Sequence, residues 1–157
     1  MKALRLGSLA AVGIAAACLW VRAGAAGDTP PPMLDALLPS GRMTLPLATL
    51  AERVTLAPGE ELRVVELARD ASTSQHLVAI RGQEVPHRHD HHDLLVVMLR
   101  GHGRMRIGAD EQPVGEGSSL YVPRGSVHAF HNESAEPAVA YAVYLPPFDG
   151  RDRVTAP

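Results

Sequence analysis

From Arg53 to the C-terminus, short runs of strand-forming residues alternate with short segments rich in Gly, Pro, Asp, Asn and Ser. Runs of this kind, separated by turn residues every 8–12 positions or about that, are typical of a β-sandwich or a small barrel. No segment after Ala51 has a sustained helical period, and the chain has no internal repeat. We therefore predict a single all-β domain, with strands over residues 53–56, 62–68, 74–80, 93–99, 103–107, 119–123, 127–131 and 138–145.

Two of these runs carry apolar residues on both strand faces. Leu94–Leu99 and Ala138–Leu145 have apolar side chains at odd and even positions alike. A strand with one solvated face would alternate between apolar and polar residues, so these two strands are expected to be covered on both sides. A double-sheet jelly roll covers its strands in this way, and the interface of a homodimer would produce the same pattern.

The segment Met1–Ala26 has the layout of a secretory signal. Lys2 and Arg5 precede the apolar stretch Leu6–Val21, and the small residues Ala23–Ala25 offer a cleavage site. The apolar stretch is shorter than the roughly 20 residues of a membrane-spanning helix, although an uncleaved membrane anchor is an alternative. The segment therefore predicts export of the chain to the periplasm.

Cys18 adds a second hypothesis of export. The sequence "IAAAC" resembles a bacterial lipobox, in which the cysteine is lipidated and becomes the mature N-terminus, although Ala15 stands where leucine is usual. In that case the signal ends at Cys18 and the chain is a membrane-anchored lipoprotein. Because Cys18 is the only cysteine, no intrachain disulfide can form, and the core alone must stabilise the fold.

The rest of the chain divides into an extension and a domain. Gly27–Pro32 is proline-rich and cannot be helical, so residues 27–50 are predicted as a tether and N-terminal extension. Within it, Met33–Pro39 is compatible with a turn or two of amphipathic helix. Residues 51–157 form the predicted β domain. Lys+Arg (15) and Asp+Glu (17) nearly balance, which argues against nucleic acid as a partner and leaves membrane contact only through the N-terminal signal or lipid anchor.

Four histidines and two aspartates stand directly before a strand run, in the stretch VPHRHDHHDLLVVMLRG (residues 85–101). On a strand, His87, His89, His91 and Asp93 would share one face because they are spaced by two. Such a stretch is a solvated polar loop, a tract that binds metal without a defined cavity, or one half of a metal site. The stretch alone leaves these three alternatives open.

A second motif narrows the choice. Gly117, Pro123, Gly125, His128 and Asn132 have the spacing G-x5-P-x-G-x2-H-x3-N. Glycines suit tight turns, and a proline at a strand end removes a donor that the sheet does not need there. This spacing resembles, position for position, the second conserved motif of the cupin superfamily.

The earlier histidine stretch resembles the first cupin motif, usually G-x5-H-x-H-x3,4-E-x6-G. His87 and His89 fit it and Gly101 ends the strand, whereas Gly82 lies one residue too close to His87. The resemblance covers about Val54–Leu145, most of the predicted domain. It implies a jelly-roll barrel, also called a double-stranded β-helix, with a mononuclear metal held by two histidines, a carboxylate and a final histidine.

Carried over to this chain, the resemblance assigns metal ligation to His87, His89, Asp93 and His128. The carboxylate is where the chain departs from the family, since Asp93 stands in place of the usual glutamate. Counting back from Gly101 by the family's spacing gives Leu94 instead, which cannot bind metal and would leave a site of three histidines. His91 is a substitute candidate. Imidazoles with one carboxylate suit divalent Mn, Fe, Co, Ni, Cu or Zn without selecting among them.

Two functions fit such a barrel. In the first, the metal acts on a small acid, diketone or phenol in an oxygenase, isomerase or decarboxylase type of reaction. In the second, the domain captures a metal or a small metal-chelating ligand and catalyses nothing; a metal buffer built on the loose histidine tract is a third alternative. Glu84 and Asp90 are the acids expected near the pocket mouth, and no general acid or base is assigned. The aromatic content of only 4% favours a small aliphatic ligand or non-catalytic binding.

Overall fold

The structure is a computed structural model that describes residues 30–38 and 41–156. The chain divides into the units Met1–Pro30 and Pro31–Pro157, and the second contains the elements described below. The predicted signal, with Cys18, lies outside the described residues. Within the described ranges, no helix has the length and apolarity needed to cross a membrane.

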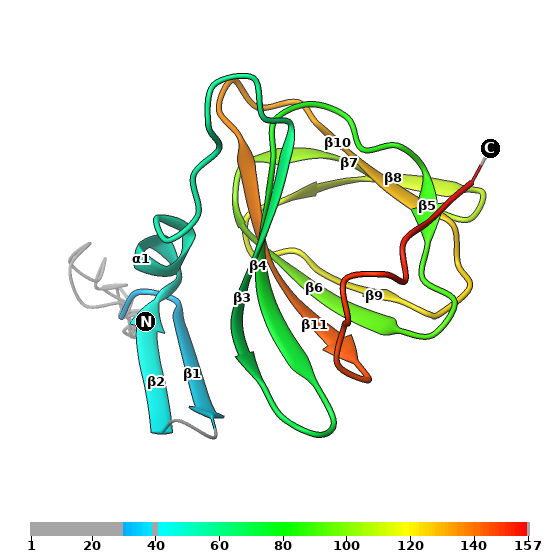
Figure 1. Cartoon of the computed structure of the whole chain (residues 1–157). Coiled ribbons are helices and arrows are strands. Elements are labelled where there is room, and N and C mark those ends of the chain that lie inside the picture. Colours follow the sequence, from blue (N-terminus) through cyan, green and yellow to red (C-terminus); the bar gives the residue numbers. More distant parts are fainter. Residues whose placement is uncertain (1–29, 39–40, 157) are drawn as a thin grey trace, which may run out of the picture. The chain divides into compact units, whose positions relative to one another are not determined.

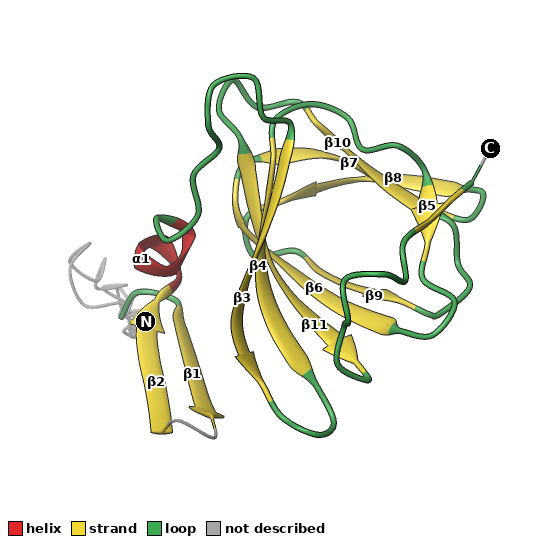
Figure 2. Ribbon diagram, in the orientation of Figure 1, coloured by secondary structure: helices red, strands yellow, loops and turns green. Residues whose placement is uncertain are grey.

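Two five-stranded antiparallel sheets form the barrel of the second unit (Figure 1, Figure 2). The histidine sheet has the order β12 (Val154–Thr155), β5 (His87–Arg88), β10 (His128–Asn132), β7 (His102–Ile107) and β8 (Asp110–Gly115). The covered sheet has the order β3 (Leu62–Arg69), β4 (Ser74–Ile80), β11 (Ala138–Leu145), β6 (Asp93–Arg100) and β9 (Ser119–Val122). From β4 to β12 the chain crosses from one sheet to the other at every step except the hairpin β7–β8, as in a jelly roll. The all-β prediction is confirmed.

The predicted runs are strands of these sheets, with one exception. Residues 53–56 have no regular structure, although Val54 is buried. The structure also adds strands that the pattern did not indicate, notably β8, which falls in the segment 108–117 predicted as a connection. β8 is an edge strand of mostly polar, exposed residues, and it tolerates Pro113 because an edge needs ladder hydrogen bonds on one side only.

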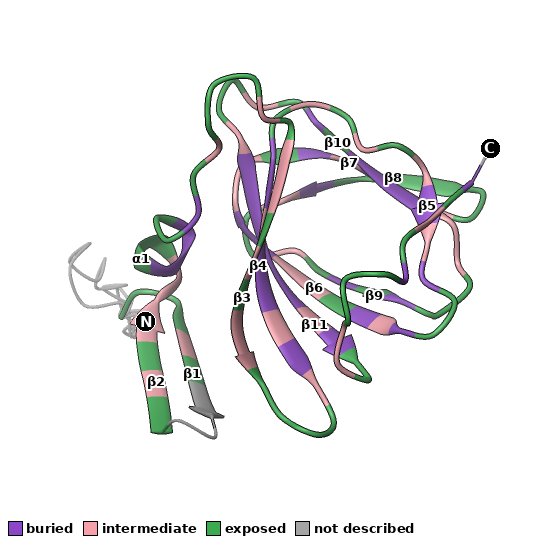
Figure 3. Cartoon of the chain, viewed as in Figure 1, coloured by how far each residue is buried: buried purple, intermediate pink, exposed green. Residues whose placement is uncertain are grey.

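Both faces of the central strand β11 are buried, as its two-sided apolar pattern predicts (Figure 3). Its inward side chains, such as Ala140 and Tyr144, join a core between the two sheets. Its outward side chains, such as Val139 and Tyr141, join a second core. This core also contains Leu50 of the N-terminal extension, which covers the outer face of the sheet. The outer layer therefore comes from this chain itself, and the homodimer stays a prediction.

The N-terminal extension that covers this sheet consists of the hairpin β1 (Met33–Leu38) and β2 (Gly41–Pro46), followed by α1 (Leu47–Ala51). The helical turn considered over Met33–Pro39 is wrong, because Met33–Leu38 pairs as a strand with β2. Pairing with a neighbouring strand satisfies the backbone groups that a short isolated helix would leave open. The helix of this extension forms after β2 instead, directly after Pro46, and it buries Leu50 and Ala51.

Candidate metal centre

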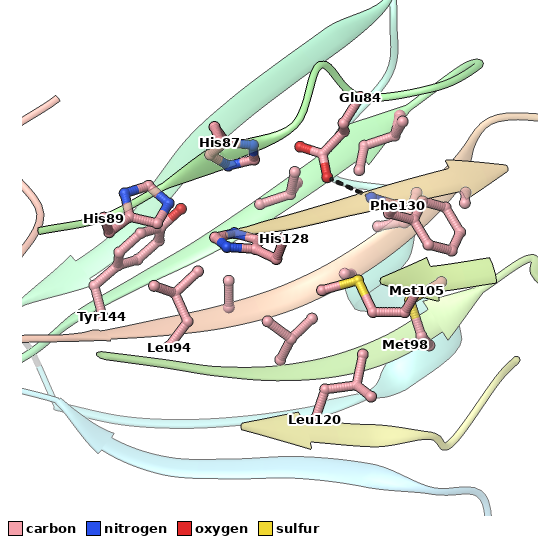
Figure 4. A pocket seen from close by; sticks show the side chains of 17 residues that line it. Glu84, His87, His89, Leu94, Met98, Met105, Leu120, His128, Phe130 and Tyr144 are labelled. Atoms are coloured by element: carbon pink, nitrogen blue, oxygen red, sulfur yellow. Dashed lines mark hydrogen bonds between the residues drawn. The ribbon is translucent and has the colours of Figure 1, made fainter. Parts of the chain in front are cut away.

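Three histidine side chains converge inside the barrel (Figure 4). His87 on β5 and His128 on β10 are direct partners across the antiparallel ladder. His89 follows β5 by one residue and turns its ring toward the same point. The ring centroids are 4.3 Å apart for His87 and His128, 5.2 Å for His87 and His89, and 5.4 Å for His89 and His128. One nitrogen of each ring lies within 4.8 Å of the others, and all three residues are buried.

The other nitrogen of each ring is held by a backbone carbonyl. His87 Nδ1 donates to Val85 O at 3.0 Å, and His128 Nδ1 donates to Ser126 O at 3.0 Å. His89 Nδ1 donates to the carbonyl of Asp152, far along the chain. Because each Nδ1 carries the proton, each Nε2 has a bare lone pair, which is the form that binds metal.

A contact of Arg153 disagrees with the assignment of the proton to Nδ1 of His87. Its Nη2 lies 3.2 Å from His87 Nδ1, and a guanidinium can only donate. The Arg153 side chain is 37% exposed and also approaches Glu84, whereas the carbonyl of Val85 is fixed by the backbone. We therefore assign the His87 Nδ1 proton to the bond with Val85.

Burial keeps all three imidazoles neutral. It lowers the pKa of His87 to about 3, with further lowering by His128 and Arg153. It lowers the pKa of His128 to about 4, and it also lowers the pKa of His89. Neutral imidazoles with converging Nε2 atoms suit a divalent transition metal, and three protein ligands leave positions open for a further ligand. The residues present therefore fit the metal that the resemblance implies.

The structure does not bring Asp93 to this cluster. The side chains of Leu94, Val96 and Met98 line the barrel interior, so strand alternation turns Asp93 outward. Arg124 binds it there, with the backbone N–H at 2.8 Å from Oδ1 and Nη2 at 2.6 Å from Oδ2. These hydrogen bonds lower the pKa of Asp93 to about 2. The arrangement matches the alternative in which Leu94 occupies the carboxylate position and the site has three histidines.

The neighbouring histidines are not part of the cluster. His91 is exposed, and His131 is exposed on the outer side of β10. His92 is buried, but its ring bonds the carboxylate of Asp152 and, at 3.2 Å, the carbonyl of Pro147. Asn132 caps a turn: its amide donates to Arg81 O at 2.9 Å and its oxygen accepts from the Ser134 N–H.

A cavity of about 70 Å³ adjoins the cluster. Its polar side chains, Glu84, Tyr144 and the three histidines, lie along one part of the wall (Figure 4). The rest of the wall is apolar and includes Met98, Met105 and Leu120. The volume has room for a few waters or a small organic ligand beside an ion.

Glu84 is the acid of this cavity. Its Oε2 accepts the Phe130 N–H at 3.1 Å, and Arg153 Nη2 lies 3.6 Å from its Oε1. Burial raises the pKa of Glu84 above its usual range, and burial raises the pKa of Tyr144 to about 12. The expectation that Glu84 lies near the pocket holds, whereas Asp90 is exposed and pairs with Arg88.

Asp152 is the residue that the sequence patterns did not indicate. It lies in the C-terminal segment, outside both motifs, yet its carbonyl and carboxylate contact the histidine turn. No spacing rule links residues this far apart, so the sequence carried no signal for it.

Comparison with known proteins places this geometry in a class. A family model described as a cupin domain matches residues 76–144. An uncharacterized protein of Aquifex aeolicus (strain VF5) is 38% identical over 95 residues, which cover 60% of this chain and 78% of that protein.

Solved structures agree. TT1209 from Thermus thermophilus matches with a TM-score of 0.55 and 25% identity, over 62% of this chain and 94% of that one. A conserved protein with a double-stranded β-helix domain from Klebsiella pneumoniae matches with a TM-score of 0.57 and 19% identity, over 68% and 92%. The fold is thus that of the double-stranded β-helix proteins. Within that class, the chain belongs to the cupin superfamily, as the two motifs indicate.

The lowered pKa values predict how stability depends on pH in the metal-free protein. Unfolded histidine has a pKa of about 6.5, so the unfolded chain binds more protons than the folded one between about pH 4 and 6.5. The free energy of unfolding should therefore fall as the pH is lowered through this window. In urea unfolding at pH 7, 6 and 5, the double variant His87→Gln, His128→Gln should lose less stability than wild type.

The exposed His131 provides the control. His131→Gln should follow the wild-type pH dependence. Equal slopes for wild type and the double variant would contradict the neutral, buried state of His87 and His128.

Proposed function

We propose that this cupin binds one divalent transition metal through Nε2 of His87, His89 and His128, and that it binds a small chelating ligand at the open positions of that metal. One observation carries the proposal. Each of the three rings has its Nδ1 engaged by a backbone carbonyl, so the three remaining nitrogens converge as acceptors, and none of them has a donor among residues 30–38 and 41–156. Several such acceptors buried together repel one another unless a cation lies between them.

The charge of the site indicates the charge of the ligand. Three neutral imidazoles leave the two positive charges of the ion uncompensated, because Leu94 lines the wall where the family has a carboxylate. Glu84 is the acid in the described wall, and Arg153 faces it from the rim. In a low-dielectric cavity an anionic ligand that chelates the metal through two oxygens is strongly favoured.

The apolar part of the wall indicates the body of the ligand. Met98, Met105 and Leu120 offer no partner for a second charge. A short aliphatic chain that carries one chelating head, such as a small 2-oxo acid or a diketone, fits this distribution and the volume of about 70 Å³.

Catalysis is a second candidate, and Glu84 favours it. A buried carboxyl group with a raised pKa beside open metal positions is a suitable proton carrier for an isomerase or decarboxylase type of reaction. The bound metal would supply charge stabilisation of an oxygen of the ligand. A non-catalytic module that captures metal or ligand would use the same histidines, and it would leave the ligand chemically unchanged.

Metal binding is tested by ligand replacement. Metal-stripped protein should bind about one Zn²⁺ per chain in competition with a chromogenic chelator. His87→Ala or His128→Ala should weaken the affinity by more than about 100-fold, beyond the loss that an outer-shell partner causes. Asp93→Ala should leave the affinity unchanged, because this side chain pairs with Arg124 on the outside.

His91→Ala is the matched control within the histidine tract, since His91 is exposed. Loss of the metal in His91→Ala but not in His87→Ala would support the buffer alternative. A loss of metal affinity in Asp93→Ala would show that Asp93 is a metal ligand.

The ligand class is tested with the cobalt-loaded protein. The visible spectrum of bound Co²⁺ should change on titration with 2-oxopentanoate at a concentration at least about tenfold lower than with 2-oxoglutarate, because the second carboxylate of the latter would lose its hydration against the apolar wall. Equal affinities would contradict the assignment of the aliphatic body. NMR of the recovered 2-oxopentanoate separates the two candidate functions, since only an enzyme changes it.

We further propose that the chain is exported by its N-terminal signal to the periplasm. The support is the basic start, the apolar stretch of limited length and the small residues that follow. Anchoring as a lipoprotein through Cys18 is the alternative.

Fractionation of a bacterium that expresses the full chain tests export. Wild type should appear in the periplasm, trimmed near Ala25 by intact mass, and Cys18→Ala should behave identically. Release from the membrane fraction by Cys18→Ala would establish the lipoprotein, and retention of the untrimmed chain in the cytoplasm would contradict export.

A further inference from the structure

The C-terminal segment 149–156 lies against the strand that carries His87 (Figure 1). Its short strand β12 pairs with β5, so that Thr155 is opposite His87. The Ala156 N–H donates to the carbonyl of Pro86 at 2.9 Å. The segment therefore extends the histidine sheet by one strand beyond the strand that carries His87.

Within this segment, Asp152 holds His89 through its backbone. His89 lies beyond the end of β5, so no ladder partner fixes its position. Its own carbonyl accepts the N–H of Gly125 at 2.7 Å, which holds the backbone but not the ring. The ring is oriented by the bond from Nδ1 to the Asp152 carbonyl, and this bond turns Nε2 toward His87 and His128.

The side chain of Asp152 holds the turn that follows His89. Its carboxylate accepts the N–H of Asp90 at 2.9 Å and the N–H of His91 at 2.8 Å. It also accepts from the ring of His92, which is buried. Although burial opposes ionisation, the hydrogen bonds of His92, His91 and Asp90 keep the pKa of Asp152 at about 2. One buried anion thus satisfies three donors of this turn.

We infer that Asp152 is a positioning residue of the metal centre: it orients His89 for metal binding from a segment outside both cupin motifs. The inference rests on the proposed metal site. Its carbonyl acts on the ring directly, and its carboxylate keeps that carbonyl in place by anchoring both Asp152 and the turn. Outer partners of this kind change metal affinity by about 10–100-fold when they are removed.

The chain offers a matched control. Asp149 lies in the same segment, is exposed, and bonds only the nearby Arg151 N–H among the described residues. Asp149→Asn removes an acid that interacts with His92 of the histidine turn through its charge, and it removes no hydrogen bond of that turn. Asp152→Asn keeps the shape of the side chain but presents an amide N–H to donors that need an acceptor, and Asp152→Ala removes the acceptor altogether.

The experiment uses the full chain, stripped of metal and titrated with Zn²⁺ against a chromogenic chelator. Asp149→Asn should bind like wild type, and Asp152→Asn and Asp152→Ala should lose about 10–100-fold in affinity. With Co²⁺, the two Asp152 variants should also show an altered visible spectrum, because one imidazole is no longer oriented. Circular dichroism should report the same strand content for all metal-free proteins.

A second measurement uses the wild-type protein and so does not depend on whether a variant folds. Nitrogen-15 NMR of the metal-free wild type should find His89 protonated at Nδ1 and bare at Nε2. A wild type that binds no metal would overturn the proposed function and the inference together. Wild-type affinity and cobalt spectrum in Asp152→Ala, or an Nε2-protonated His89 in wild type, would overturn the inference alone.

Discussion

The hydrogen bonds from three imidazole Nδ1 atoms to backbone carbonyls are the interaction on which the chemistry of this barrel depends. Val85, Ser126 and Asp152 supply the carbonyls, and each one fixes both the rotation of a ring and the nitrogen that carries its proton. Without these hydrogen bonds, the lone pairs of three buried neutral rings would turn away from one another, because acceptors repel. The barrel therefore pre-organises acceptors before any ion arrives, which reduces the cost of ordering on binding.

The charge of the cavity wall depends on which side chains of β6 point inward. Because β6 turns Leu94 inward, Asp93 lies outside with Arg124, and the inner wall lacks the carboxylate that the family usually has there. Glu84 enters the same cavity from the segment before β5, where burial raises its pKa and Arg153 lies 3.6 Å away. The site thus combines three neutral imidazoles, one acid with a raised pKa and an apolar remainder. The proposal of a small anionic chelator as ligand rests on this combination.

Two cores hold this wall in place. The core between the sheets contains the apolar lining of the cavity, and the core on the outer face of the covered sheet is completed by Leu50 and Val54 from the N-terminal part of the described chain. At the other end, the segment around Asp152 closes the histidine sheet. The histidine cluster is consequently assembled from positions near residues 87, 128 and 152, and both ends of the described chain pack against the sheets that carry its walls.

The sequence by itself determined what depends on local spacing. Strand alternation predicted that both faces of β11 are covered, and motif spacing indicated His87, His89 and the turn that leads to His128, because each pattern is a property of a few consecutive residues. The orientation of the His89 ring was decided by the fold, since His89 lies beyond β5 and the Asp152 carbonyl holds it. The same alternation left two phases open for β6, and only the packed sheet selected the one that turns Asp93 outward. Edge strand β8 and the contacts of Asp152 were decided by tertiary structure alone. Their residues have weak local preferences, and the partners that stabilise them lie on other strands or some 60 residues away in the chain, where the fold and no short-range pattern brings them together.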